Sequence, residues 1–417
     1  MPKRNKVFSL LLSIFFFSFP LISCGDEPGF AKYTPDVFLC DLTYDQSEWI
    51  IKGIQKENGN RIAEIPDMID GKPVTQILSL DYRPNNEETS LHFTEIGIIT
   101  IGKNVKTLSP YVFRDMLGLT QVLFAQDSQL EKIVQGAFAG CTNLSSLVLP
   151  DSLKYLEGET FNGCTNLTSL YIPKNLEVFN RSFDCGITTL SIDEENAFYS
   201  VVDNVLYNKD KTALEYYPAK KFDEAFTVLE STTQIMGVAF SGCKNLKTVN
   251  LGNVTKVDRQ AFAGCENITT ITADHLSMVD DNPFQDTAWF KNYVGGEIFL
   301  GKCLLSYTKF AFALDLTGYT SIAPYAFKGH TDLHRITFDN ELINIGEGAF
   351  MDCTNLYEVI FYNPSRMVFI SKDSFENNAT NRFFKVHESL FNDYATYNNY
   401  ATNEFWQPYK DSIKTFN

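Results

Sequence analysis

The chain has little positive charge, and this scarcity limits what it can attract. Lys and Arg total 35 against 51 Asp and Glu, which gives 417 residues a formal net charge of -16. Such a surface repels polyanions, so nucleic acid is not expected as a partner, nor is charge-driven binding to an anionic membrane. Disorder and a collagen-like helix are also excluded, because 44% of the residues are hydrophobic and only 24 are Gly. The chain is expected to fold.

Motifs of the common enzyme and metal-binding classes are missing as well. The sequence has no G-x-S-x-G and no C-x-x-C pair, and it has only 5 His. His330 and His334 have the spacing of a helical metal pair, but they fall in a turn and in a strand segment of the repeat described below. We therefore expect packed or solvated histidines, no metal site, no cofactor and no enzyme.

The N-terminus lacks an apolar run long enough to span a membrane. The uncharged stretch 7–23 contains 17 residues and is interrupted by Pro20, whereas a membrane helix needs about 20. Three basic residues precede it, which is typical of a secretory signal peptide. The last residues of the stretch and the two that follow read Leu-Ile-Ser-Cys-Gly, which resembles the bacterial lipobox, whose Cys is diacylated before cleavage. We expect residues 1–23 to be a lipoprotein signal peptide and Cys24 to carry the lipid.

The expected tether comprises residues 24–39, so the membrane is a partner through the lipid anchor only. Asp26 and Glu27 follow the lipidated Cys closely. They resemble the surface-export signal of Bacteroidetes lipoproteins, but a short flexible linker explains them equally well. The expected location is the outer membrane of a bacterium, on its outer surface, with the periplasmic face as the open alternative.

The body of the chain is a tandem repeat centred on a Phe position. Phe accounts for 35 of the 417 residues. The segment Ala-Phe138-Ala-Gly-Cys-Thr-Asn-Leu-Ser-Ser-Leu-Val-Leu recurs 23 residues later around Phe161. A period of 22 to 25 with an L-x-x-L-x-L core predicts a leucine-rich repeat solenoid, in which each turn contributes one strand and relies on its neighbours for burial. The frame is also present at Phe113, Phe183, Phe240, Phe262, Phe284, Phe327, Phe350 and Phe375.

Alternation within the strand separates core from surface. Leu147 and Leu149 are expected to point inward, and Ser146 and Val148 to lie on the surface of a parallel sheet. Phe138 and its equivalents are expected to stack as a ladder on the opposite wall.

These residues resemble the BspA-type leucine-rich repeat family of bacterial surface proteins, whose repeat reads I-x-x-x-A-F-x-x-C-x-x-L-x-x-I-x-I-P. The segment 345–361, Ile-Gly-Glu-Gly-Ala-Phe-Met-Asp-Cys-Thr-Asn-Leu-Tyr-Glu-Val-Ile-Phe, follows it closely. The resemblance covers roughly residues 40–417. It implies a right-handed solenoid over residues 40–385, with a parallel β-sheet on one face.

Two further features are implied by the same resemblance. The stretch Val-Val-Asp-Asn204-Val-Leu-Tyr-Asn-Lys-Asp resembles a family hairpin, with Asn204 in place of the usual Gly, so a β-hairpin insertion is expected at about 196–225. Residues 386–417 depart from the repeat and resemble a C-terminal cap, which a solenoid needs over its last apolar turn.

Cys and Asn occur at fixed places in the repeat. Reduced core thiols are favoured over disulfides, because most Cys lie three residues after the repeat Phe and point the same way. These are Cys141, Cys164, Cys243, Cys265 and Cys353, whereas the pairing of Cys40, Cys185 and Cys303 stays open. A backbone-bonding ladder is favoured over a ligand site for Asn143, Asn166, Asn245, Asn267 and Asn355.

The outward residues of the strands form the candidate binding surface, which is small, hydroxyl-rich and mostly neutral. They are Gln121, Ser146, Ser169, Tyr171, Thr189, Thr248, Asn250, Thr270, Thr272, Arg335, Thr337 and Glu358. We expect a non-enzymatic binding module on the cell surface with an extracellular or host protein as partner; adhesion is what the family resemblance implies. The alternative is a glycan-binding lipoprotein of a nutrient-uptake system, using the aromatic rings of Tyr171, Trp289 and Trp406.

Overall fold

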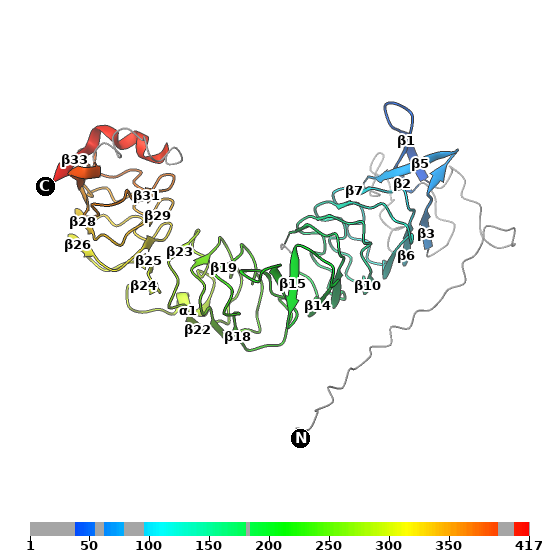
Figure 1. Ribbon diagram of the computed structural model, residues 1–417, viewed down its shortest axis with the longest axis horizontal. Coiled ribbons are helices and arrows are strands. Elements are labelled where there is room, and N and C mark those ends of the chain that lie inside the picture. Colours follow the sequence, from blue (N-terminus) through cyan, green and yellow to red (C-terminus); the bar gives the residue numbers. More distant parts are fainter. Residues whose placement is uncertain (1–37, 55–61, 79–95, 181–183, 391–403, 417) are drawn as a thin grey trace, which may run out of the picture. The chain divides into compact units, whose positions relative to one another are not determined.

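The computed structural model describes residues 38–54, 62–78, 96–180, 184–390 and 404–416. Cys24, the signal peptide and Phe183 lie outside these residues. The described chain winds as a leucine-rich repeat solenoid built from parallel ladders (Figure 1). The fold class predicted from the sequence is therefore confirmed.

Each regular turn contributes two strands rather than the one that the sequence predicted. The first carries the L-x-x-L-x-L residues, and together these strands make the long-strand sheets. The long strands are β3 (Ile62–Ile65), β6 (Ile98–Ile101), β8 (Gln121–Phe124), β10 (Ser146–Leu147), β12 (Ser169–Ile172), β14 (Thr189–Ile192), β18 (Ala225–Thr227), β20 (Thr248–Asn250), β22 (Thr270–Thr272), β26 (Ala313–Leu316), β28 (Arg335–Phe338), β30 (Glu358–Phe361), β32 (Phe383–His387) and β33 (Ile413–Phe416).

A second ladder lies just before the Phe turn, and most of its strands have two residues. It forms the short-strand sheets, which also run parallel from turn to turn. Their strands are β5 (Lys72–Ile77), β7 (Thr107–Leu108), β9 (Lys132–Ile133), β11 (Tyr155–Leu156), β13 (Val178–Phe179), β17 (Ala213–Tyr216), β19 (Gln234–Ile235), β21 (Lys256–Val257), β23 (Met278–Val279), β25 (Cys303–Tyr307), β27 (Ser321–Ile322), β29 (Asn344–Ile345) and β31 (Phe369–Ile370).

Irregular elements open, interrupt and close the array. Near the start, β1 (Phe38–Leu42) pairs with β2 (Trp49–Ile54), and β4 (Met68–Ile69) pairs with β5. At the end, the 3-10 helices Glu388–Leu390 and Glu404–Ser412 precede β33, which pairs with β32. Trp406 in this last segment is fully buried, and its Nε1 donates to the Val368 carbonyl at 2.9 Å.

Hairpins occupy both of the long gaps between repeat Phe residues. In the first, β15 (Tyr199–Val202), β16 (Val205–Asn208) and β17 pair antiparallel, within the predicted insertion. Asn204 has a φ of 63°, in the left-handed region that Gly adopts most readily and that Asn tolerates better than most residues. In the second, the one-turn helix α1 (Ala288–Lys291) precedes β24 (Glu297–Leu300), which pairs antiparallel with β25. The sequence did not predict this second hairpin.

The core follows the alternation that the repeat predicts. Leu147 and Leu149 are 6% and 2% exposed, whereas Ser146 and Val148 are exposed. The predicted stack of Phe rings is also present: Phe240 and Phe262 have centroids 4.7 Å apart. Tyr217 and Tyr307 continue the stack after the hairpins, at 5.1 Å from Phe240 and 5.0 Å from Phe327 respectively.

Buried cysteines link each turn to the one before it. The thiol of Cys141 donates to the Phe113 carbonyl at 3.0 Å, and that of Cys353 donates to the Phe327 carbonyl at 3.0 Å. The described cysteines at the repeat positions are free thiols, as predicted, and so are Cys185 and Cys303.

Removing one ring of the stack should destabilise the array strongly. Phe262 is fully buried between Phe240 and Phe284, whose ring centroids lie 4.7 and 5.2 Å away. We expect F262A to lower the free energy of unfolding by about 3–5 kcal/mol, measured by denaturant titration followed by circular dichroism. The matched control is F222A, since Phe222 is 84% exposed and its loss should cost less than about 0.5 kcal/mol. Equal losses in the two variants would contradict the stack as a source of stability.

The thiols should be unreactive in the folded protein. Burial raises the pKa of Cys141, Cys303 and Cys353 to about 12 each, so little thiolate exists at pH 8. We expect Ellman's reagent to modify no buried cysteine at pH 8 until denaturant is added, and then to modify all of them. The denatured protein serves as the reference for full reactivity of the same cysteines. Fast modification of the repeat cysteines without denaturant would contradict their burial.

Candidate functional site: the outer face of the long-strand sheets

The strand register brings many of the predicted surface residues into cross-strand rows. Ser169 lies opposite Thr189. In the next long-strand sheet, Thr248 lies opposite Thr270, and Asn250 lies opposite Thr272. All six are exposed. The rows present hydroxyl and amide groups without a charge, so this face can donate and accept hydrogen bonds over several turns.

The remaining predicted residues lie on the same kind of face, with one correction. Arg335 and Glu358 are cross-strand neighbours in the last long-strand sheet. Thr337 was predicted to be exposed, but it is only 9% exposed. It points outward, yet neighbouring side chains of the same sheet rise around it and form a cavity of which it is part. Alternation gives the direction of a side chain but not the height of its neighbours.

An apolar row runs beside the hydroxyl row near the N-terminal end, and sequence reasoning did not select it. Leu123 on β8, Val148 directly after β10 and Tyr171 on β12 occupy equivalent outward positions of the repeat and are 43%, 68% and 37% exposed. A selection based on polar side chains included Tyr171 but missed Leu123 and Val148. The same alternation would have found them, because each lies two residues after a selected polar residue.

Tyr171 is held in place at the end of this row. Its hydroxyl donates to Asp193 Oδ2 at 2.9 Å. Burial of the ring and the Asp193 carboxylate raise the pKa of Tyr171 to about 12, so the side chain stays neutral. The ring therefore presents a fixed, uncharged surface beside Val148.

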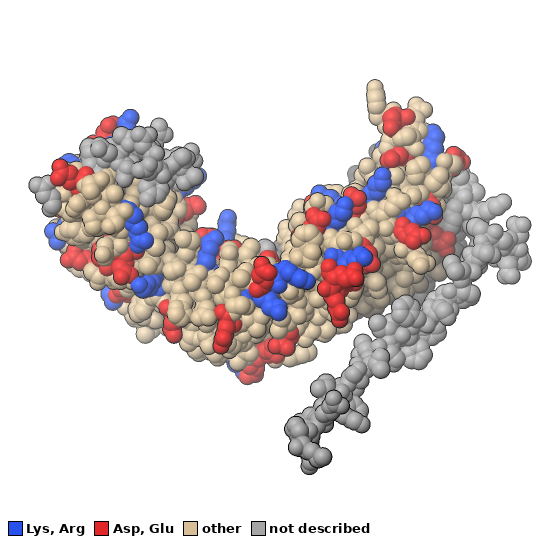
Figure 2. Space-filling model, viewed as in Figure 1, with Lys and Arg blue, Asp and Glu red and all other residues tan. Residues whose placement is uncertain are grey.

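The short-strand sheets differ, because their charges are paired across turns. Lys132 Nζ lies 2.6 Å from Glu157 Oε1, and Lys256 Nζ lies 3.0 Å from Asp280 Oδ2. Figure 2 shows Lys and Arg side chains next to Asp and Glu side chains over much of the visible surface. Such exposed pairs contribute little stability, but they leave few unsatisfied charges for a ligand.

The Asn side chains that recur in the repeat bond to the backbone or to one another. Asn143, Asn245, Asn267 and Asn355 donate through Nδ2 to a carbonyl of the preceding turn, at 2.7, 2.9, 2.7 and 2.6 Å. Asn166 instead donates to Asn143 Oδ1 at 3.3 Å. The predicted structural ladder is therefore present, and these side chains are not available as a ligand ladder.

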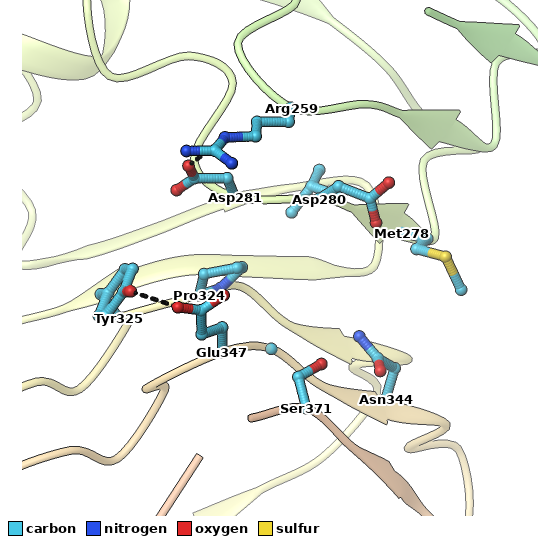
Figure 3. Close-up of a pocket in the computed structure, with 11 residues that line it drawn as sticks. Arg259, Met278, Asp280, Asp281, Pro324, Tyr325, Asn344, Glu347 and Ser371 are labelled. Carbon is cyan, nitrogen blue, oxygen red and sulfur yellow. Dashed lines mark hydrogen bonds and ion pairs between the residues drawn. The ribbon is translucent and has the colours of Figure 1, made fainter. Parts of the chain in front are cut away.

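A polar cavity of about 350 Å³ lies where the short-strand ladder is interrupted after β23 (Figure 3). Its carboxylates already have partners. Arg259 Nε lies 3.3 Å from Asp281 Oδ2, and the Tyr325 hydroxyl donates to Glu347 Oε1 at 2.9 Å, an interaction that raises the pKa of Tyr325. No activated nucleophile lines this cavity, and we assign it no chemistry.

The two histidines with metal-like spacing are not a metal site. His330 is buried, with Nδ1 2.8 Å from Asp332 Oδ1 and Nε2 2.7 Å from the Lys309 carbonyl. His334 Nδ1 is bonded to the Asp332 carbonyl. Within the described chain, no group of three or more His, Cys, Asp or Glu is arranged to hold a metal ion.

The aromatic residues proposed for glycan stacking have different surroundings. Trp406 is fully buried against the last turn, so the alternative interpretation, in which its ring stacks on a glycan, is wrong. Trp289 is half-buried and packs edge-on against Phe284, while one side of it lines a shallow cavity with Tyr293.

Among the described residues, no helix is both long and apolar enough to cross a membrane.

Comparisons with known proteins agree with the architecture. The model of the BspA type Leucine rich repeat region matches in 6 copies over residues 87–212, 221–297 and 320–410. The structure of the pneumococcal vaccine antigen PcpA is 20% identical and covers 92% of this chain and 96% of its own, with a TM-score of 0.51, which shows a shared fold.

More distant solved structures are also similar. A leucine rich cell surface protein from Faecalibacterium prausnitzii is 20% identical over 81% of this chain and 95% of its own, with a TM-score of 0.38. A leucine-rich repeat protein from Eubacterium ventriosum is 20% identical over 82% and 93%, with a TM-score of 0.43. No protein of curated function matches the chain.

Proposed function

Because the chain belongs to the BspA-type leucine-rich repeat family, we propose that it is a non-enzymatic binding module that attaches to a protein partner outside the cell. The observation that carries this proposal is the row of Leu123, Val148 and Tyr171 beside the hydroxyl row on the outer face of the long-strand sheets. The partner is an extracellular or host protein, and the biological role is adhesion.

The chemistry of this face suits a protein partner. The core of a protein interface is typically apolar and aromatic with few charges, and polar groups surround it. Val148 is 68% exposed in the centre of the row, and Ser146 and Ser169 next to it carry hydroxyl groups. Tyr171 supplies a fixed ring of the kind that often dominates binding energy. Exposed apolar side chains aligned on successive turns are more typical of an interaction site than of a solvated sheet.

We further propose that Cys24 anchors the protein by its lipid in the outer membrane, with the solenoid outside the cell. The support is the sequence Leu-Ile-Ser-Cys-Gly at residues 21–25, where the signal-like stretch 7–23 meets Cys24. Two or more acyl chains give stable membrane attachment. An anchored solenoid would then present its long-strand face to partners at the surface.

A charge placed in the apolar row should abolish binding to the partner. We expect V148D to weaken binding at least about tenfold, because burying an unpaired carboxylate costs more than the 1.4 kcal/mol that a factor of ten represents. The measurement is biolayer interferometry of the chain from residue 25 onward against a panel of extracellular-matrix proteins, followed by titration of the protein that binds.

The matched control for this experiment is V178D. Val178 is 44% exposed and outward-facing on the short strand β13, so the substitution is the same on the other ladder. It should leave the dissociation constant unchanged within about twofold, since this side chain lies outside the proposed interface. Equal weakening by the two variants, or a panel in which no protein binds, would refute the proposed binding face.

Lipid attachment should depend on one side chain. Replacing the acceptor thiol in C24S is expected to abolish metabolic labelling with palmitate and to release the protein from the membrane fraction. Protease added to intact cells should digest the wild-type solenoid if it lies outside. Labelling that persists in C24S would exclude this anchor, and complete protection from protease beside an accessible surface control would place the protein on the periplasmic side.

A further inference from the structure

The outer face of the last long-strand sheet has a cavity where β28 pairs with β26 on one side and with β30 on the other. The cavity has a volume of about 300 Å³ and lies away from the apolar row of the proposed protein interface. Asp315, Thr337 and Ile360 form one cross-strand row, and Arg335 lies two residues before Thr337. The residues that matter for its chemistry are Asp315, Arg335, Thr337, Asp339, Ile360 and Tyr362.

Two oppositely charged side chains line this cavity but do not form an ion pair with each other. Neither Asp315 nor Arg335 has a hydrogen-bond or ion-pair partner among the described side chains, although both border the same space. The cross-strand neighbour of Arg335 is Glu358, but that carboxylate is occupied by Lys385 at 2.6 Å. An acceptor-only group and a donor-only group are thus left facing solvent in one small cavity.

A second carboxylate is fixed at the end of β28. Asp339 accepts hydrogen bonds from the backbone N–H of Gly318 at 2.6 Å and from that of Glu341 at 3.0 Å. These two bonds fix the position of the Asp339 carboxylate beside the cavity. The lining therefore carries two negative charges and one positive charge.

Tyr362 supplies an aromatic surface at the same place. It directly follows β30, is 52% exposed, and its ring is braced edge-on against Phe416 with the centroids 5.1 Å apart. A ring that is braced from one side and open to solvent suits the apolar C–H face of a sugar. Thr337 and Ile360 lie between this ring and the Asp315 carboxylate along the sheet.

We propose that this cavity binds a neutral hexose residue of a glycan. A sugar hydroxyl both donates and accepts, so one ring can donate to Asp315 and accept from Arg335 at once. A phosphate, sulfate or uronate would pair with Arg335 but would face the carboxylates of Asp315 and Asp339. A cation would be repelled by the positive charge of Arg335. The volume lies at the small end of ligand sites, about 300–1,000 Å³, which fits a single sugar residue of a chain that continues into solvent.

Affinity electrophoresis tests the proposal, because a polysaccharide offers many copies of a weak ligand. The chain from residue 25 onward is run in native gels that contain a β-glucan, an α-glucan, an α-mannan or a galactan, with polygalacturonate and heparin as anionic probes. We expect at least one neutral polysaccharide to retard the protein. R335A and Y362A should each weaken this retardation about tenfold or more, since each removes a contact to the sugar, and Y362F should keep it.

The control R259A removes an exposed arginine that lies in the other cavity and is paired with Asp281. It should leave the retardation unchanged, and so should V148D, whose defect is confined to the protein partner. Failure of the sugar site and failure of the protein interface are therefore distinguished by different variants. Thermal melting of every variant confirms that the surface substitutions leave the fold intact.

D315N separates neutral from anionic ligands by the sign of its effect. Loss of the carboxylate acceptor should weaken binding of a neutral sugar, but it would strengthen binding of an anionic ligand by removing repulsion. The proposal is overturned if no neutral polysaccharide retards the chain, or if only the anionic probes do so and D315N enhances them. It is also overturned if R259A weakens retardation as much as R335A, which would indicate nonspecific attraction.

Discussion

The whole structure depends on one constraint, which is that no turn of the solenoid can bury its own apolar face. Each turn closes a thin layer whose two sides are covered only by the layers before and after it. Stacked rings such as Phe240, Phe262 and Phe284 provide this coverage on one wall, and the two parallel ladders provide it on the others. The thiol of Cys265, which donates to the Phe240 carbonyl at 2.9 Å, satisfies a buried acceptor of the neighbouring layer at the same time. Each core side chain packs against the equivalent side chain of the next turn. The same residue types therefore recur at the core positions.

This constraint also explains how much could be predicted from the sequence. The Phe positions, the inward Leu pairs and the thiols recur at a fixed spacing, so the fold and the core could be derived without coordinates. The two-residue strands of the second ladder could not, because a segment such as Lys132–Ile133 is too short to show a period. The hairpin of β24 and β25 was missed because it lacks the sequence pattern V-x-D-x-V-L-Y of the first hairpin. Its turn consists of Gly301 and Lys302.

The candidate site was predictable only in part, because side chains on the outer face are not constrained by their copies. Alternation correctly assigned Ser146 and Thr270 to the surface, but it could not indicate that Thr337 is enclosed by neighbours from other turns. Trp406 shows the opposite error, since an aromatic residue outside the repeat was open to two interpretations until its burial was known. The cavity with the unpaired charges is formed by three strands together. No pattern within one segment of the sequence can therefore predict which charged residues share it.

Freedom from the repeat is what makes the outer face suitable for function. The hydroxyl rows, the apolar row and the unpaired charges of Asp315 and Arg335 all occupy outward positions along the long strands of one scaffold. A substitution there changes recognition without changing the layer that the turn must cover, whereas the same substitution at Phe262 would leave two layers uncovered. Distinct ligand chemistries can therefore occupy separate stretches of the same ladder, and each can vary while the stacking interactions that hold the solenoid together remain unchanged.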